Sequence, residues 1–445
     1  MSNRSDDSQN VSSGASRRDF LKTSSIVAAS GALAGTLNIA RSAHASVDDT
    51  IRIALIGCGG RGTAACGQAL STAGPVKLIA MADMFPDRLD LSYKELSTKH
   101  KDRVDVPSDR KHLGFDAYKK VLEMPDVDLV LLVTPPGFRP IHFEAAVQAG
   151  KHIFMEKPVS TDANGIRRVL AAAAEAKKKD LKVGVGLQRH HSAGYKETMK
   201  RLHDGVIGDM HTVRIYWDGP NPWTKPRKPG MTEMEYQLRN WYNFTWICGD
   251  HIVEQHIHNI DVAHWLKNAL PIKANGVGGR AGEKGLGFGE IFDHHAVEFE
   301  YADGSRVFSQ CKRISGSNWN PVSEHVQGSK GQADISGHRI DAKGKAIWRY
   351  KGKEKDAYQV EHDDLFAAVR QGKSYNEAEY AAGSTMMAIL GRMCTYSGNA
   401  LRWEEALQST VSVMPKEFAM TAAPPTLPDK EGYYRIYAPG VTKVV

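Results

Sequence analysis

A short stretch of the chain, from Gly249 to Asp261, concentrates side chains that can transfer protons or bind hydroxyl groups. On a helix of 3.6 residues per turn, its polar residues share one face and its apolar residues occupy the opposite one. The polar face holds His251, Glu254, Gln255, His258 and Asp261. A face this rich in ionisable groups, backed by an apolar one, predicts the wall of a pocket, and Asp250 is expected to cap the helix N-terminus.

Three of these side chains, His251, Glu254 and His258, could also converge on a zinc ion. Three ligands at these spacings on one helix match no established metal signature, however. A merely solvated helix face is the other alternative, but such faces favour Lys and Glu over His. The stretch therefore predicts a face for proton transfer or substrate binding, and no metal is expected.

A second set of residues has the spacing needed to bind a pyrophosphate. Gly57, Gly59 and Gly62 stand in a G-x-G-x-x-G pattern directly after the apolar run Ile51–Ile56. The first glycine allows a tight turn, the second lets backbone N–H groups approach a pyrophosphate, and the third lets the next helix pack closely. The pyrophosphate would lie at the positive N-terminus of that helix.

Asp83 ends a second apolar run, from Val76 to Ala82. A carboxylate at this position accepts hydrogen bonds from the adenosine ribose, and it would repel the 2′-phosphate of NADP. We therefore favour NAD over NADP. The alternative is that Asp83 only caps a turn or a helix.

The elements that must position these residues follow an alternating pattern. Further apolar runs predict buried strands, each separated from the next by a helical segment, and they cover residues 126–133, 151–155 and 183–187. The run at 126–133 is followed by Thr134-Pro135-Pro136, which would hold an extended loop at the edge of the cofactor crevice. This order predicts an α/β fold with a doubly wound parallel sheet of the Rossmann type.

Beyond this sheet, the chain predicts an α+β region. An aromatic-rich stretch contains Trp223, Trp241, Tyr242 and Trp246, and its rings are suited to cover the C–H faces of a sugar. An ordinary hydrophobic loop core is an equally weighted alternative. Alternating residues on both sides of Asp303-Gly304 then predict a hairpin in a large, open, mainly antiparallel sheet.

Together, these features resemble the glucose–fructose oxidoreductase / inositol dehydrogenase family, known as Gfo/Idh/MocA. The most specific motif is Glu156-Lys157-Pro158, which follows Ala149-Gly150-Lys151-His152. The resemblance runs from about Asp49 to Leu407. It implies an NAD-dependent oxidoreductase in which the following residues lie at the cofactor: Gly57, Gly59, Gly60, Arg61, Gly62, Asp83, Thr134, Pro135, Glu156 and Lys157.

The resemblance also implies catalytic roles. Lys157 would lie near the nicotinamide and the reacting carbinol, where an ammonium stabilises developing alkoxide charge. His258 would take the carbinol proton, with Glu254 orienting its imidazole from one turn away. The substrate would be bound by four further residues, namely Arg189, Trp241, His251 and Asp261.

Three positions depart from the family pattern. Glu254 lies where the family usually has Asp, His256 where it usually has Gly, and Arg139 where it often has His. Glu254 has a longer side chain than the usual Asp, and His256 is bulkier than the usual Gly. They put the substrate geometry, and with it the reaction, in question.

The first 45 residues predict an export signal. Ser16-Arg17-Arg18-Asp19-Phe20-Leu21-Lys22 has the twin-arginine pattern, and Ala43-His44-Ala45 is a small-residue cleavage site, so the mature chain would begin at Ser46. The intervening stretch is too polar and glycine-rich for a membrane anchor. Twin-arginine export carries folded proteins to the periplasm, so NAD bound before export would have to be held tightly.

Composition limits the remaining possibilities. Removing the predicted signal leaves a formal net charge of +5, which is too mild for nucleic-acid binding. The five cysteines are widely spaced and odd in number, so neither a disulfide framework nor a cysteine zinc site is indicated. We expect three parts: the signal (1–45), an NAD-binding domain (46–188) and a substrate-binding and oligomerisation domain (189–445) whose C-terminal tail extends as an arm over a partner or neighbour.

The sequence thus predicts hydride transfer between a nicotinamide and a secondary carbinol of a sugar, polyol or glycoside, in a homo-oligomeric enzyme (dimer or tetramer). One alternative is a redox-assisted glycosidase or lyase, in which transient oxidation leads to bond cleavage with no net redox change. The other is a non-catalytic sugar-binding protein on the same fold.

Overall fold

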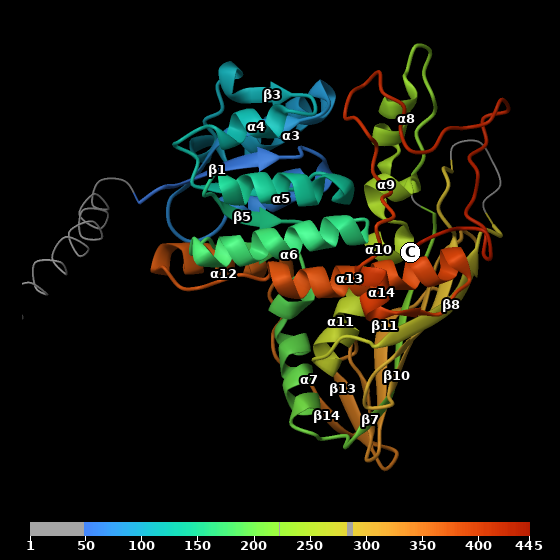
Figure 1. Ribbon diagram of the computed structural model, residues 1–445. Coiled ribbons are helices and arrows are strands. Elements are labelled where there is room, and N and C mark those ends of the chain that lie inside the picture. Colours follow the sequence, from blue (N-terminus) through green and yellow to red (C-terminus); the bar gives the residue numbers. More distant parts are fainter. Residues whose placement is uncertain (1–48, 222, 283–287) are drawn as a thin grey trace, which may run out of the picture. The chain divides into compact units, whose positions relative to one another are not determined.

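The structure is a computed structural model that describes residues 49–221, 223–282 and 288–445. The predicted export signal lies outside the described residues. Residues 51–445 form one compact unit, which is described by itself here (Figure 1).

The first half of this unit is built on a sheet of six parallel strands in the order β3-β2-β1-β4-β5-β6. The strands are β1 (Ile51–Ile56), β2 (Val76–Asp83), β3 (Lys111–Leu113), β4 (Leu129–Leu132), β5 (His152–Met155) and β6 (Val183–Val185). The helices between them are α2 (Gly60–Leu70), α3 (Pro86–Lys99), α4 (Ala117–Leu122), α5 (Arg139–Gln148) and α6 (Ala163–Lys178).

Side chains of β1 show why this sheet is covered on both faces. Ile53 and Leu55 pack in one apolar cluster with residues of α2 and α3, whereas Ala54 and Ile56 pack in another with residues of α4, α5 and α6. Successive side chains of a strand point to opposite faces, so a strand that is apolar throughout must be buried on both. The predicted doubly wound sheet is confirmed.

One helix of the second half returns to this sheet. Helix α12 (Ala357–Gln371) places Leu365 and Phe366 in the same cluster as Ile53 and Leu55. A Cβ atom on Gly184 of β6 would come within 3.0 Å of Leu365. The division at residues 188 and 189 stays a prediction, but the packing shows that the nucleotide-binding sheet also uses a later part of the chain.

The second half contains a nine-stranded sheet in the order β14-β13-β12-β11-β7-β10-β9-β8-β15. Its strands are antiparallel except for the pair β7 and β10, so the predicted open, mainly antiparallel sheet is confirmed. They are β7 (Met210–Gly219), β8 (Lys273–Gly279), β9 (His294–Glu300), β10 (Arg306–Arg313), β11 (Val322–Gly328), β12 (Gln332–Asp334), β13 (Arg339–Ala342), β14 (Lys345–Arg349) and β15 (Leu401–Arg402).

Helices cover one face of this sheet and join it to the first. The long helix α13 (Ala378–Ser397) packs against both α6 and strands β8 and β9 (Figure 1). The other helices are α7 (Ala193–His203), α8 (Glu233–Arg239), α9 (Thr245–Cys248), α10 (His251–Glu254), α11 (Ile257–Lys267) and α14 (Trp403–Leu407).

The predicted continuous helix over residues 250–261 is wrong, because the chain breaks between α10 and α11. The N–H of His256 bonds to the carbonyl of His251, five residues back, and the N–H of His258 to that of Gln255, three residues back. The buried His256 ring lies within hydrogen-bond distance of Ser309 Oγ on β10 (2.7 Å), which holds the break in place. Asp250 does cap α10, since its carboxylate accepts the N–H of His251.

The C-terminal arm, residues 408–445, contains neither a helix nor a strand. It lies on its own chain. Tyr434 and Val444 are buried, and Ser409 donates a hydrogen bond to the carbonyl of Val444 (2.6 Å). All five cysteines are buried and free.

In the described part of the chain, no helix has both the length and the apolar character needed to cross a bilayer.

Candidate active site

A cavity of about 610 Å³ opens at the carboxyl ends of strands β1, β2, β4 and β5. We call it the crevice. Its wall combines the glycine turn after β1, the ends of the other three strands, and residues of α8, α10 and α11 from the second half of the chain. In doubly wound sheets this edge is where dinucleotides bind.

The glycine turn has the geometry that its spacing predicts. Gly57 has a φ of +101°, and a Cβ atom there would lie 2.5 Å from the backbone nitrogen of Thr134. A Cβ atom on Gly62 would lie 1.9 Å from the carbonyl oxygen of Gly57. Space is open around the Cα atoms of Gly59 and Gly60, so the turn leaves room for a pyrophosphate at the N-terminus of α2.

Asp83 lies at the end of β2 and lines the crevice. Its carboxylate accepts the N–H groups of Cys58 (2.6 Å) and Phe85 (2.9 Å), and burial raises its pKa. Asp83 therefore acts as a turn residue, and it stands where a ribose-binding carboxylate is expected. The two interpretations of the sequence are compatible.

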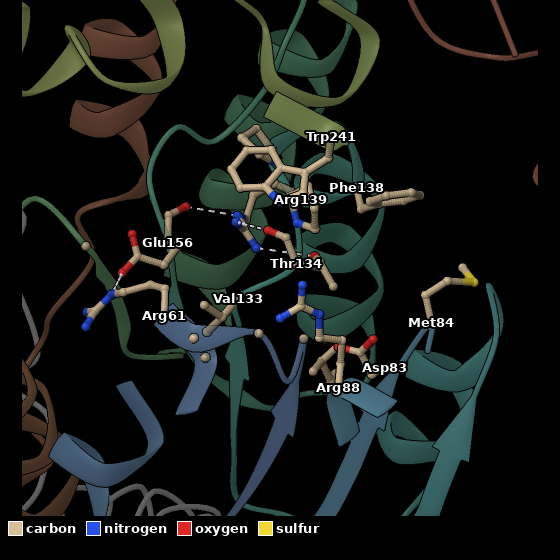
Figure 2. Close-up of a pocket in the computed structure, with 18 of the residues that line it drawn as sticks. Arg61, Asp83, Met84, Arg88, Val133, Thr134, Phe138, Arg139, Glu156 and Trp241 are labelled. Carbon is tan, nitrogen blue, oxygen red and sulfur yellow. Dashed lines mark hydrogen bonds and ion pairs between the residues drawn. The ribbon is translucent and has the colours of Figure 1, made fainter. Parts of the chain in front are cut away.

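Arg61 joins three elements beside the turn. Its guanidinium pairs with Glu156 after β5 and with Glu361 of α12 (3.0 Å), and Figure 2 shows it turned toward Glu156. Burial, together with the charge of Glu156, raises the pKa of Glu361 well above its usual range. This corner of the crevice holds two carboxylates around one arginine.

Arg139 supports the loop that carries Thr134 and Pro135. Its buried side chain donates to the carbonyl oxygens of Glu156 (2.9 Å) and Thr134 (2.5 Å), as Figure 2 shows. His142 contacts the Thr134 hydroxyl (3.2 Å). Arg139 thus braces the crevice wall through backbone contacts in place of the His that the family often carries.

Lys157 is held inside the crevice by Glu254. Its ammonium donates to the backbone carbonyl of Glu254 (2.5 Å) and to one carboxylate oxygen (3.1 Å), and both side chains are about nine-tenths buried. Among the described residues, no hydrogen bond or ion pair joins Glu254 to His258, and Glu254 pairs with Lys157 instead.

His258 lines the crevice from α11, and its ring stacks on Trp217 with the centroids 5.6 Å apart. Burial lowers its pKa well below 6.5, and the nearby charges of Lys157, Arg189 and Arg61 lower it further. No hydrogen-bond partner for its ring occurs among the described residues. The imidazole is therefore neutral at pH 7, as a proton acceptor must be.

The four predicted substrate residues divide into two pairs. Arg189 and Trp241 line the crevice, and Arg189 is held by a buried ion pair with Glu324 of β11. His251 and Asp261 do not line it.

Both of these side chains lie in the interior. His251 is buried, and burial lowers its pKa to about 3. Asp261 is turned toward His190 (2.8 Å) and Ser384 (2.9 Å). The predicted shared face is therefore wrong for these two residues.

The residues of the aromatic stretch also lie in two different environments. Trp223 and Trp241 line the crevice with their rings 6.4 Å apart, whereas Trp246 is buried in an apolar cluster with Phe244. Both alternatives for this stretch are therefore partly correct.

Helix α12 carries two residues that the sequence analysis missed. Tyr358 lines the crevice and accepts a hydrogen bond from Gln188 (3.0 Å), and Glu361 pairs with Arg61 beside it. They lie about 300 residues from the glycine turn, and no local pattern marks them. Trp217 of β7 also lines the crevice, and no local pattern indicates its contact with His258.

Comparisons with known proteins agree with this geometry. A family model described as "Oxidoreductase family, NAD-binding Rossmann fold" (GFO_IDH_MocA) matches residues 51–185, and the GFO/IDH/MocA C-terminal domain matches residues 195–334. The two matches cover more than half of the chain. The chain belongs to the Gfo/Idh/MocA oxidoreductase family.

Relatives of known name fit this assignment. An inositol 2-dehydrogenase of Rhizobium meliloti (strain 1021) is 24% identical over 333 residues, which are 73% of this chain and 90% of the relative. A 2,7-anhydro-N-acetylneuraminate hydratase of Escherichia coli (strain K12) is 26% identical over 219 residues, 47% of this chain and 51% of the relative.

A solved structure shares the fold. The scyllo-inositol dehydrogenase of Lactobacillus casei, with bound NAD(H) and scyllo-inositol, superposes with a TM-score of 0.60 at 19% identity and covers 80% of this chain and all of that one.

As a member of the Gfo/Idh/MocA family, the protein is an NAD-dependent oxidoreductase. The crevice fits this cofactor, because the cradle at Gly59 and Gly60 is open and the N-terminus of α2 faces it. Within the described residues, no group of three His, Cys, Asp or Glu side chains is arranged to hold a metal ion.

Proposed function

We propose that the protein transfers a hydride between a secondary carbinol of a sugar, polyol or glycoside and its bound nicotinamide. One observation carries the proposal: the Lys157–Glu254 pair and the neutral His258 line the same crevice as the glycine turn. The names of the inositol dehydrogenase relatives support a polyhydroxylated substrate.

The bound nicotinamide supplies the hydride acceptor at C4. Lys157 donates a hydrogen bond to the carbinol oxygen and stabilises the negative charge that develops there as hydride leaves. His258 accepts the hydroxyl proton, and its lowered pKa keeps it free to do so. Glu254 fixes the ammonium of Lys157 at the substrate end of the crevice.

Arg189 and the aromatic rings would bind the rest of the substrate. Arg189 is anchored by Glu324, and Trp217, Trp241 and Tyr242 present ring surfaces to the crevice. Such rings cover the C–H faces of sugars while charged groups bind hydroxyls. A sugar or polyol suits this wall better than an apolar alcohol.

The test offers purified mature protein a panel of sugars, polyols and aryl glycosides without added nucleotide. We expect absorbance of reduced nicotinamide to rise and stop at one turnover, and a keto product to be released when an electron acceptor is supplied. No reduction with any member of the panel, in protein shown to contain NAD, would contradict the proposal.

A second candidate keeps the cofactor but has no net oxidation. The relative named as a 2,7-anhydro-N-acetylneuraminate hydratase shows that the family includes an enzyme named for water addition. Transient oxidation of a glycoside acidifies the neighbouring C–H, whose removal breaks the glycosidic bond, and Glu254 and His258 supply two groups for proton transfer. Repeated release of aglycone without lasting reduction of NAD would favour this candidate.

Non-catalytic sugar binding is the weakest candidate, because a binding protein has no need for the Lys157–Glu254 pair. A Lys157→Ala variant that binds sugar and loses no turnover would revive it.

We further propose that the enzyme is exported through the twin-arginine pathway and works in the periplasm. The motif around Arg17 and Arg18 supports this, and cleavage before Ser46 is the testable consequence. N-terminal sequencing of protein recovered from the periplasm checks it, and a mature chain that keeps residues 1–45 would contradict it.

A further inference from the structure

The adenosine end of the crevice is bridged by a helix of the second half. Helix α8 contributes Leu238 and Arg239 to the wall, opposite Met84 and Phe85 at the end of β2. Asp83 lies directly beside these residues, so α8 faces the expected ribose position.

Arg239 links α8 to the nucleotide-binding half. Its Nη1 and Nη2 atoms donate to the two carboxylate oxygens of Asp87, each at 3.3 Å, and Asp87 lies in the first turn of α3. The guanidinium lies 3.9 Å from the ring centroid of Phe85, and Glu235 holds it from its own helix (2.9 Å). Partial burial raises the pKa of Asp87, but Arg239 and Arg88 together lower it below its usual value.

The C-terminal arm contacts α8, and the two lie beside each other in Figure 1. Gln237 donates to the carbonyl of Thr426 (2.8 Å), and the Tyr434 hydroxyl is within hydrogen-bond distance of Glu233. The ring of Phe418 lies 5.9 Å from Phe115 and 5.7 Å from Phe138, both of which line the crevice.

We propose that Asp87 and Arg239 form a latch that retains the dinucleotide across catalytic cycles. The proposal rests on the same placement of the cofactor in the crevice as the proposed function, but not on which substrate is oxidised. For the adenosine end to leave, α8 must move away from β2, and this movement breaks a bidentate ion pair. Asp87 is a positioning residue here, since it acts on the nucleotide only through α8.

The test measures how fast the loaded protein releases NADH. The protein is saturated with NADH, and unbound NADH is removed. It is then mixed with a large excess of NAD while the fluorescence of bound NADH is followed. We expect Asp87→Asn to release NADH about five-fold faster, since an exposed bidentate pair contributes up to about a factor of five. Asp87 is half exposed, so the folded state should tolerate the change.

The matched control is Asp105→Asn, which removes another surface ion pair of the same half, with Lys77 at 3.0 Å. This variant should release NADH at the wild-type rate. Added salt should accelerate release from the wild type but not from Asp87→Asn, because salt screens exposed ion pairs. The Phe418→Ala variant should also release NADH faster, because it removes ring contacts between the arm and the crevice wall.

Equal release rates for Asp87→Asn and the wild type would overturn the latch, as would equal acceleration by Asp105→Asn. So would wild-type protein that loses NADH within seconds. The assay contains no substrate, so a failure of the sugar chemistry would leave its result unchanged.

Discussion

The ammonium group of Lys157 faces a buried carboxylate rather than solvent. This pairing explains how a charged side chain is kept at the substrate end of the crevice. A buried charge without a partner is strongly unfavourable. Glu254 supplies that partner for the ammonium of Lys157. Burial lowers the pKa of His258, and the positive charge of Lys157 lowers it further. In the proposed reaction, Lys157 stabilises charge and His258 transfers the proton.

Replacing Lys157 with Met should lower kcat about 10²- to 10³-fold, because the developing alkoxide loses its donor. NAD should still bind, since the glycine turn is unchanged. Lys151→Met is the control: Lys151 is a buried lysine of the same half that donates to the carbonyls of Met124 and Val127, outside the crevice. Its kcat should stay near wild type even if its stability falls. Equal losses of kcat in both variants would contradict the role of Lys157.

The pH dependence of kcat/KM should report His258 in the free enzyme. A base with a lowered pKa is unprotonated above that value and loses activity only as the pH falls through it. We therefore expect kcat/KM to stay level as the pH is lowered through 6.5 and to fall only at more acid pH. An acid limb at or above pH 6.5 would show that His258 is not the base or is not buried.

At the scale of the elements, the glycine turn and the break between α10 and α11 do most to shape the crevice. The turn needs glycine where the backbone of another element approaches, as at Gly57 and Gly62. The break separates Glu254 at the end of α10 from His258 in α11, and both side chains line the crevice. A regular strand–turn–helix could not replace the glycine turn, and a straight helix could not replace the break.

The pair Gly62→Ala and Gly60→Ala should separate packing from backbone flexibility in α2. A methyl group at Gly62 would meet the carbonyl oxygen of Gly57 at 1.9 Å, whereas nothing lies within 4 Å of one at Gly60. We expect Gly62→Ala to lower the free energy of unfolding by about 2 kcal/mol or more and to abolish NAD binding. Gly60→Ala should change it by less than about 1 kcal/mol. Chemical denaturation and NADH titration measure both, and similar behaviour of the two variants would contradict the turn geometry.

For the whole molecule, the open face of the nine-stranded sheet is the candidate surface for the expected homo-oligomer. Val277 of β8 and Phe308 of β10 are exposed on it, with 73% and 43% of their surface accessible. Exposed apolar side chains on a broad sheet are typical of interfaces. We propose that a second copy of the chain covers this face.

Replacing Phe308 with Glu should then dissociate the oligomer, because a charge would be buried against the partner. Light scattering on a sizing column measures the mass, and Leu427→Glu in the arm, where Leu427 is also exposed, serves as the control. An unchanged mass for Phe308→Glu, or dissociation by both variants, would show that this face is not the interface.

Much of the molecule could be predicted from the sequence. The parallel sheet, the glycine turn with Asp83, the hairpin around Gly304 and the family were all predicted, because each depends on residues close together in the chain. The positions of Lys157 and His258 on one crevice were predicted through the family motif. Their chemistry stays a proposal.

Other features were decided only by the tertiary structure. The contact of His256 with Ser309 lies at the break after α10, the corner at Arg61 depends on Glu361, and the latch depends on Asp87 meeting Arg239. Each pair joins residues between about 50 and 300 positions apart, and no local pattern encodes such a contact. The sequence by itself therefore determined the cofactor-binding element and the family, whereas packing between the two halves decided which polar side chains reach the crevice.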